Sequence, residues 1–444
     1  NVSNMKYTIG IQTFEEVIDG GYSYVDKTAL VYKLTHYAKN LFLSRPRRFG
    51  KSLLVSTLQA YFEGRKDLFK GLAIEKMEQE WEVYPVIHID MSRGKYYQLK
   101  NLHAILNGIL SNYEDLYHVE TLSENSDVYS ERLANIIAAA CRQTGKQVVV
   151  LIDEYDAPMH DSMNDEKLQN QIRNVLRDFF SPLKQQDANL RFVFITGISK
   201  FSQLSIFSEL NNLKILTMKN EYATVCGFTE EEILKKYTED IEAFAEENEM
   251  TYDEAVAALR NHYDGYHFSE KSPGIYNPFS IINALDDKEL NSYWFSSGTP
   301  TFLVELLQKK GLDMLQLDDL WASDKRFDVP TEKISDPIPV LYQSGYLTIK
   351  EYDKQSRQYR LGFPNEEVRQ GFSTSLFRYY SPDGMGKYDA LCRAYSACVV
   401  RDGDMRAFLS HLKTFYDKFP YTLVNNNERH YQAVMYTIFA MLGA

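Results

Sequence analysis

The feature that most constrains the fold is an alternation of short apolar runs with amphipathic helical segments across the first half of the chain. In the helical segment 51–62, for instance, Leu54, Leu58 and Phe62 fall on one face, and Gly64 marks the end. Apolar runs of strand length occur at residues 41–43, 86–89, 148–152 and 192–195, and more weakly at 213–216. Apolar strands that alternate with helices predict a parallel sheet covered by helices on both faces.

A glycine-lysine-serine sequence follows the first apolar run and precedes the helix 51–62. Strand, loop and helix in this order are the layout of a P-loop, where backbone amides at the helix N-terminus face phosphates. Lys51 is expected to reach the β- and γ-phosphates, and the Ser52 hydroxyl to ligate Mg²⁺. Arg45 occupies the position of the pattern's first glycine. The start of the loop therefore lacks the additional backbone conformations that a glycine can adopt. The alternative is a chance Gly-Lys-Ser before a helix.

The basic residues of this loop add positive charge where a triphosphate would bind. Residues 39–70 contain 8 basic and 2 acidic side chains (8 − 2 = +6), although the whole chain carries −12. The overall charge argues against wholesale wrapping of nucleic acid. Arg47 and Arg48 are expected either to neutralise transition-state charge, which would make Arg48 catalytic, or to hold the loop by pairing with carboxylates. The expected nucleotide-binding residues of the loop are Arg45, Pro46, Arg47, Arg48, Phe49, Gly50, Lys51, Ser52 and Leu53.

Two carboxylates, Asp153 and Glu154, follow the buried run 148–152 directly. Ligands of open α/β sheets bind at the carboxyl ends of the strands. Asp153 is therefore expected to hold Mg²⁺ through water, and Glu154 to polarise the attacking water. The alternative is a solvated acidic turn. Thr196, at the end of the next strand, either senses the γ-phosphate or caps a turn. Together the two motifs predict a site for ATP and Mg²⁺.

With these motifs in order, the chain resembles the bacterial AAA-ATPase-like family, usually fused to a C-terminal PD-(D/E)XK nuclease-superfamily domain. The likeness runs through most of the chain, and in particular residues 10–12, 24–28, 45–53, 152–158, 196–201, 207–213, 227–229, 263–266, 276–278, 344–347 and 362–368. The family's loop looks the same, so the resemblance makes Arg45 a family trait. The chain is also similar, more distantly, to signal-transduction P-loop ATPases, in which a Gly-x-Pro motif approaches adenine. Gly298 and Pro300 would supply that motif here, or form an ordinary helix-initiating turn.

The expected fold is an α/β P-loop NTPase core, with a parallel sheet and helices on both faces, followed by a helical and winged-helix-like region. The core is expected at residues 1–228, and the helical lid with the winged-helix-like region at 229–400. A helix ending at Gln343, a hairpin over 346–361 and a helix opened by Asn365 suggest the wing. The resemblance implies that residues 401–444 begin a truncated nuclease-like domain without its metal motif.

The leading functional hypothesis is a Mg²⁺-dependent ATPase that acts as a nucleotide switch for an attached nuclease-like effector. No nuclease activity is expected of this chain. The alternatives are a sensor or scaffold that binds nucleotide without hydrolysis, or a regulatory protein that binds DNA; an oligomer is also compatible with the sequence. Four cysteines without a disulfide or zinc spacing favour the cytoplasm. No stretch approaches the roughly 18 apolar residues of a membrane span.

Overall fold

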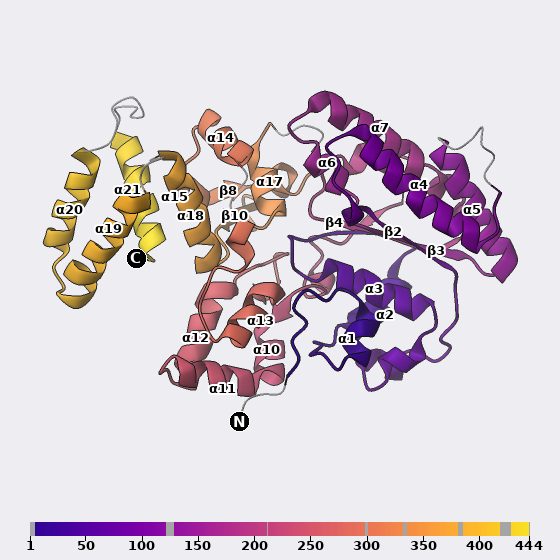
Figure 1. Ribbon diagram of the computed structural model, residues 1–444, viewed down its shortest axis with the longest axis horizontal. Coiled ribbons are helices and arrows are strands. Elements are labelled where there is room, and N and C mark those ends of the chain that lie inside the picture. Colours follow the sequence, from indigo (N-terminus) through magenta and orange to yellow (C-terminus); the bar gives the residue numbers. More distant parts are fainter. Residues whose placement is uncertain are drawn as a thin grey trace.

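The computed structural model describes residues 5–120, 128–210, 212–297, 301–331, 335–380, 385–417 and 428–443. An α/β part lies at one end of the molecule, a helical part at its middle, and the last helices of the chain at the other end (Figure 1). Over these residues, no helix is both long enough and apolar enough to cross a membrane. The four cysteines form no disulfide with one another.

The five apolar runs form one sheet, as the sequence predicts. Its strands are β1 (Asn40–Ser44), β2 (Val86–Asp90), β3 (Val148–Asp153), β4 (Leu190–Gly197) and β5 (Lys214–Ile215). They lie in the order β2-β3-β4-β1-β5, and every neighbouring pair is parallel. The carboxyl ends of β1, β4 and β3 therefore meet at one edge, with β4 between the two strands that carry the expected motifs.

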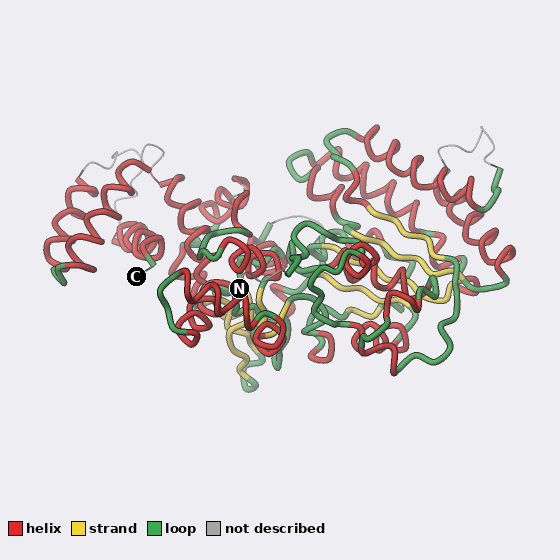
Figure 2. Tube along the Cα trace, turned by 60° about the horizontal axis from the view of Figure 1, so that its bottom comes forward, coloured by secondary structure: helices red, strands yellow, loops and turns green. Residues whose placement is uncertain are grey.

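Helices cover both faces of this sheet (Figures 1 and 2). One face packs on α1 (Phe14–Asp19), α2 (Thr28–Tyr37) and α3 (Lys51–Phe62), and the other on α4 (Leu99–Leu116), α5 (Tyr129–Thr144) and α7 (Glu166–Phe180). Strand side chains alternate between the two cores. In β3, Val149 and Leu151 join the first core, whereas Val148, Val150 and Ile152 join the second. Short helices α6 (Ala157–Asp161), α8 (Pro182–Gln185) and α9 (Gln203–Ile206) complete this part.

A helical subdomain follows the sheet and packs around its own core. It contains α10 (Glu230–Lys236), α11 (Thr238–Glu247), α12 (Tyr252–Tyr263) and α13 (Pro278–Asp287), and the two-stranded pairing of β6 (Phe228–Thr229) with β7 (Ile275–Tyr276). Thr229 caps α10, and Glu232 reaches back to the Thr229 backbone, so both ends of this capping box are made.

The next segment contains a three-stranded antiparallel sheet in the order β8-β10-β9. The hairpin predicted from the sequence is β9 (Thr348–Asp353) with β10 (Gln358–Gly362), and Asn365 opens the following helix by accepting from the Val368 amide. The remaining elements are α14 (Thr301–Lys309), α15 (Met314–Asp318), β8 (Leu320–Ala322), α16 (Asp324–Phe327), α17 (Pro337–Gln343), α18 (Glu366–Tyr380), α19 (Met385–Tyr395), α20 (Met405–Asp417) and α21 (Glu428–Leu442).

A buried carboxyl on α18 helps to join this region to the loop after β1. Glu367 is 1% exposed and accepts a hydrogen bond of 2.7 Å from the Trp294 amide. The Trp294 indole in turn donates to the Arg47 carbonyl oxygen at 3.1 Å. Burial raises the pKa of Glu367 to about 7, because the ionised form loses its hydration.

We expect Glu367→Gln to stabilise the protein above neutral pH. The pKa of Glu367 is higher in the folded protein than in the unfolded chain, where it is 4.5. The contribution of Glu367 to the free energy of unfolding is therefore fully present below pH 4.5. This contribution is lost as the pH rises through about 7. The neutral amide escapes this loss, worth on the order of 3 kcal/mol. Thermal unfolding between about pH 5 and pH 8 should show a Tm advantage of the variant that grows with pH; a constant offset contradicts the buried neutral carboxyl.

Candidate functional site

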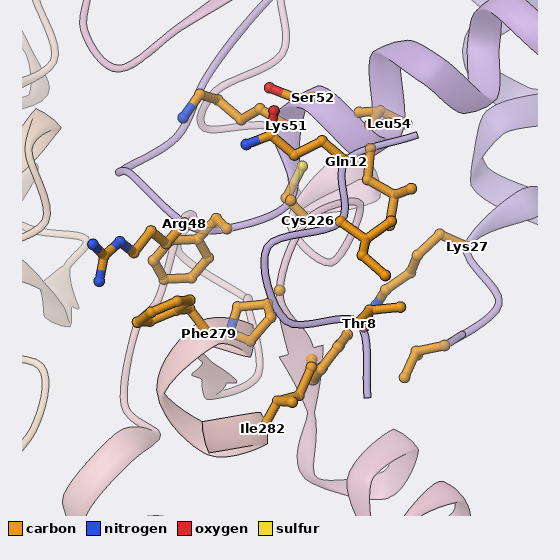
Figure 3. A pocket seen from close by; sticks show the side chains of 18 of the residues that line it. Thr8, Gln12, Lys27, Arg48, Lys51, Ser52, Leu54, Cys226, Phe279 and Ile282 are labelled. Atoms are coloured by element: carbon orange, nitrogen blue, oxygen red, sulfur yellow. The ribbon is translucent and has the colours of Figure 1, made fainter. Parts of the chain in front are cut away.

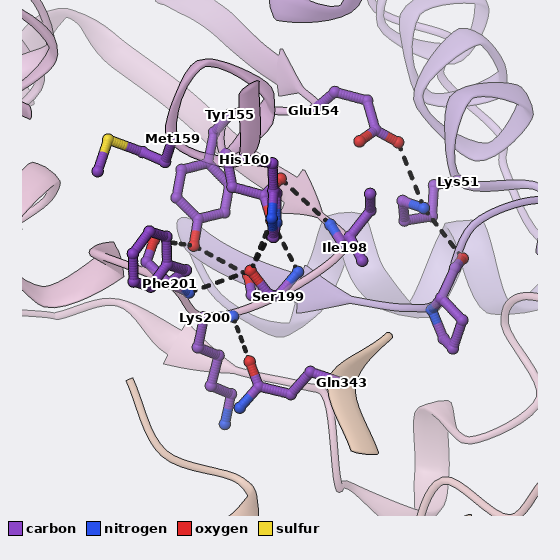
Figure 4. Close-up of polar contacts among 12 residues, drawn as sticks. Lys51, Glu154, Tyr155, Met159, His160, Ile198, Ser199, Lys200, Phe201 and Gln343 are labelled. Atoms are coloured by element: carbon purple, nitrogen blue, oxygen red, sulfur yellow. Dashed lines mark hydrogen bonds and ion pairs between the residues drawn. The ribbon is translucent and has the colours of Figure 1, made fainter. Parts of the chain in front are cut away.

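The loop after β1 ends in a left-handed residue from which α3 starts. Gly50 has φ +90°, a conformation that favours glycine, and Lys51 is the first residue of the helix. The Lys51 side chain is buried, and its Nζ donates to the Pro46 carbonyl oxygen at 3.1 Å. Its other partner is Glu154, with 3.3 Å between Nζ and Oε1 (Figure 4). The structure thus brings together the lysine and the glutamate that the sequence singled out.

Asp153 lies at the end of β3, beside Ser52, and is 3% exposed. Burial and the neighbouring Glu154 charge raise the pKa of Asp153 to about 7, and a hydrogen bond with Ser52 opposes this rise. The Asp153 Oδ1 atom is buried without a hydrogen-bond partner. A buried carboxylate oxygen left in this way fits a cation, since desolvation is otherwise uncompensated.

This donor set suits Mg²⁺ better than a metal held by protein alone. Among the described residues, no group of three or more His, Cys, Asp or Glu side chains could hold an ion. Mg²⁺ usually keeps several waters and binds one or two carboxylates together with the phosphates of a substrate. The Ser52 hydroxyl and the Asp153 carboxylate are therefore a sufficient protein contribution.

A cavity of about 320 Å³ opens beside these groups (Figure 3). Lys51, Ser52 and Glu154 line it from the sheet edge. Its other walls come from the segment before α1, the segment between α1 and α2, the start of β6 with the turn before it, and α13. They include Thr8, Ile9, Gln12, Val25, Cys226, Phe228, Phe279, Ile282 and Asn283. Mostly apolar walls with a few polar groups are typical of small-molecule sites.

The guanidinium of Arg45, one of the expected nucleotide-binding residues of the loop, lies in the core, and Arg45 is not among the residues that line the cavity. Arg45 is 1% exposed and donates to the carbonyl oxygens of Thr217 at 2.8 Å and Tyr222 at 3.2 Å. The group also lies 4.2 Å from the centre of the Phe268 ring. An arginine in place of the usual glycine therefore ties the end of β1 to the chain after β5.

The next two arginines contact the protein in different ways. Arg48 lies 4.0 Å from the centre of the Phe279 ring and donates to the Tyr293 carbonyl oxygen at 3.0 Å (Figure 3). Arg47 is exposed, and its backbone carbonyl accepts a bond from Trp294. Within the described residues neither arginine pairs with a carboxylate, as one interpretation expected. Arg48 also lines the cavity, and its role in neutralising transition-state charge stays a prediction.

Thr196 makes a bond within the sheet. Its hydroxyl donates to the Leu43 carbonyl oxygen at 2.7 Å, and the residue is fully buried. The hydroxyl thus bonds to the neighbouring strand and does not cap a turn, and its role in sensing the γ-phosphate stays a prediction. Gly298 and Pro300, the other expected nucleotide contacts, lie outside the described residues.

Sequence reasoning assigned no site role to the walls contributed by Thr8, Gln12, Phe228 and Phe279. The segments 10–12 and 227–229 stood out as family-like stretches, but nothing in their local pattern pointed to a ligand. They meet only because α13 and the N-terminal segment fold back over the loop, and contacts between distant segments leave no spacing in the sequence. The one sequence signal was the glycine at position 227, which can indicate a turn or a close approach of the backbone. In the structure Gly227 has φ +85°, and a Cβ there would lie 2.3 Å from Ile275.

We expect Arg45→Met to destabilise the protein by on the order of 3 kcal/mol, because the carbonyl oxygens of Ser44, Thr217 and Tyr222 lose the hydrogen bonds that the buried guanidinium donates. Arg47→Met is the matched control, and its exposed side chain should contribute within about 0.5 kcal/mol. Chemical denaturation of both variants measures the difference. Equal stabilities would contradict the structural role of Arg45.

Two comparisons place the chain among known proteins. A family model described as "Predicted AAA-ATPase" matches residues 8–207, which include β1 to β4, the loop after β1 and the Asp-Glu pair after β3. The chain is also similar to a protein of Azotobacter chroococcum mcd 1 named "Uncharacterized protein in vnfD 5'region". The two are 32% identical over 457 aligned positions, which cover 100% of this chain and 84% of the relative. The match over residues 8–207 and the similarity to this relative over the whole chain show that the chain belongs to the predicted AAA-ATPase family.

Proposed function

We propose that this protein binds ATP with Mg²⁺ in the 320 Å³ cavity and hydrolyses it slowly, as a nucleotide switch. The observation that supports the proposal is that Lys51, Ser52 and Glu154 line one end of that cavity, with Asp153 beside Ser52. Family membership implies nucleotide binding in general. The chemistry of the four side chains supports the more specific proposal of hydrolysis.

Each residue has a distinct role in this proposal. Lys51 binds the β- and γ-phosphates, and the amides at the start of α3 orient them. Ser52 and Asp153 hold Mg²⁺, which when bound supplies positive charge to the phosphate oxygens. Glu154 accepts a proton or hydrogen bond from the attacking water. The base occupies the apolar part of the cavity, and the absence of an Asn-Lys-x-Asp guanine-reading motif in the sequence favours ATP over GTP.

The ion pair between Lys51 and Glu154 has a consequence for the order of events. The two atoms lie 3.3 Å apart, so Lys51 neutralises the carboxylate that must act as base. Phosphates that bind Lys51 compete for its charge and release Glu154. Glu154 also has φ +50°, a left-handed conformation uncommon for this residue type. Nucleotide binding would in this way prepare the site for hydrolysis.

The three-stranded sheet and its helices support a winged-helix-like regulatory module, as the order α16, α17, β9, β10 suggests. We propose that it links the nucleotide state to an effector, such as a nuclease-like domain. The basic hairpin gives little support to DNA binding. Lys350 donates to the Pro364 carbonyl oxygen at 3.2 Å, and Arg360 pairs with Glu351 at 3.2 Å, so both charges have partners within the protein.

The test is phosphate release from Mg-ATP. Wild type should turn over, whereas Lys51→Ala should lose binding and turnover, and Glu154→Gln should retain binding and lose on the order of 100-fold or more in kcat. Equal rates in the three proteins contradict the assignment.

The alternative, a sensor that binds but does not hydrolyse ATP, is favoured by one observation, the neutralised Glu154. It predicts tight binding with no turnover in wild type, and no kinetic difference between wild type and Glu154→Gln. DNA or a candidate partner added at saturating concentration would leave that result unchanged.

A further inference from the structure

The turn that carries Glu154 is tied to the segment after β4. The Tyr155 amide donates to the Thr196 carbonyl oxygen at 3.2 Å. The Tyr155 hydroxyl reaches further along the same segment, to the carbonyl oxygens of Ser199 at 2.9 Å and Phe201 at 3.1 Å (Figure 4). Tyr155 is fully buried, so these bonds form away from water.

Asp156 completes this attachment from the other side of the turn. It is 0% exposed and accepts from the Ile198 amide at 3.2 Å, and from the Ser199 amide and hydroxyl at 2.8 and 2.7 Å. His160 contacts the same carboxylate at 2.9 Å. Gly197 permits the close approach, because a Cβ at that position would lie 2.4 Å from Asp156 Oδ1. The family-like stretch 196–201 is thus shaped to fit the turn.

The far end of the same segment is fixed to the C-terminal half of the chain. The Lys200 amide donates to Gln343 Oε1 at 2.7 Å, and Lys200 Nζ pairs with Asp328 Oδ2 at 2.6 Å. Gln343 also donates to the carbonyl oxygens of Phe327 at 3.1 Å and Val329 at 3.0 Å. Lys200, Asp328 and Gln343 are all largely buried. Because water cannot replace a lost partner there, breaking these polar contacts is costly in free energy.

We infer that residues 197–202 position Glu154 for hydrolysis, and that their contacts with Gln343 and Asp328 help to hold them in place. This inference rests on the proposed ATPase function. Asp156, Lys200 and Gln343 are positioning residues and touch no reacting atom. The groups expected to bind the nucleotide, Lys51, Ser52 and the cavity walls, stand on other elements. Loss of the C-terminal contact should therefore reduce hydrolysis and spare binding.

The arrangement makes Asp328 and Gln343, at the ends of α16 and α17, a part of the hydrolysis site although neither lines the cavity. A displacement of about 1 Å in a catalytic group can cost on the order of 100-fold in rate. A movement of α16 and α17 away from the sheet would release Lys200, and with it the segment that holds Asp156 and Tyr155. The same bonds would carry the effect in reverse, from a bound nucleotide to the C-terminal half.

The test uses two variants of the full chain and a matched control. Gln343→Met keeps the length of the side chain but removes its three hydrogen bonds, and Asp328→Asn removes the charge opposite Lys200. Lys184→Met removes an exposed ion pair with Glu209 and should leave kinetics unchanged. We expect both test variants to lower kcat for Mg-ATP about 10- to 100-fold while the Kd for ATP changes by less than about twofold. Unchanged kcat in both contradicts the inference, as does an equal loss of binding and kcat.

Deuterium exchange without nucleotide separates this inference from the proposed function. The amides of residues 154–157 should exchange faster in Gln343→Met than in wild type or Lys184→Met, because their attachment to 197–202 is loosened. The same exchange rate in all three proteins overturns the inference, whether or not ATP is hydrolysed. No ATP turnover in wild type, combined with faster exchange in Gln343→Met, contradicts the ATPase assignment and supports the attachment.

Discussion

The site depends on a buried positive charge that the protein must satisfy. Lys51 is 4% exposed, and an ammonium group that is buried without partners would be strongly destabilising. The carbonyl oxygen of Pro46 and the carboxylate of Glu154 supply the partners from opposite sides. This is possible because the strand order brings the ends of β1 and β3 to the same edge, with β4 between them. The oxygens of a triphosphate could replace these two partners of the Lys51 ammonium. The need to satisfy this buried charge therefore shapes the loop without nucleotide and favours phosphate binding when nucleotide is present.

Local sequence patterns were enough to predict the α/β core and one half of the site. The strands and the helix over residues 51–62 follow from apolar periodicity. The Gly-Lys-Ser sequence marks the start of that helix, and the Asp-Glu sequence marks the end of β3. The base-side walls could not be predicted in this way. Ile9 and Phe279 face the same cavity from segments far apart in the chain, and only tertiary packing brings them together.

The loop arginines and Thr196 show a second limit of sequence reasoning. Arginine beside a phosphate loop suggests contact with phosphate, but charge alone does not give the direction of a side chain. Arg45 turns into the core and finds two backbone carbonyl oxygens and an aromatic ring. The Thr196 hydroxyl bonds to the neighbouring strand. These partners lie on segments distant in the chain from Arg45 and Thr196, so the local sequence does not display them.

The proposed activity requires Mg-ATP to bind where Lys51 meets Asp153 and Glu154. Isothermal titration calorimetry of the full chain with ATP, in the presence and absence of Mg²⁺, measures this binding. We expect one ATP per chain, weaker binding without Mg²⁺ or in Asp153→Asn, and no detectable binding in Lys51→Ala. Binding of equal strength in wild type and Lys51→Ala, or no binding by a folded wild type, would contradict it.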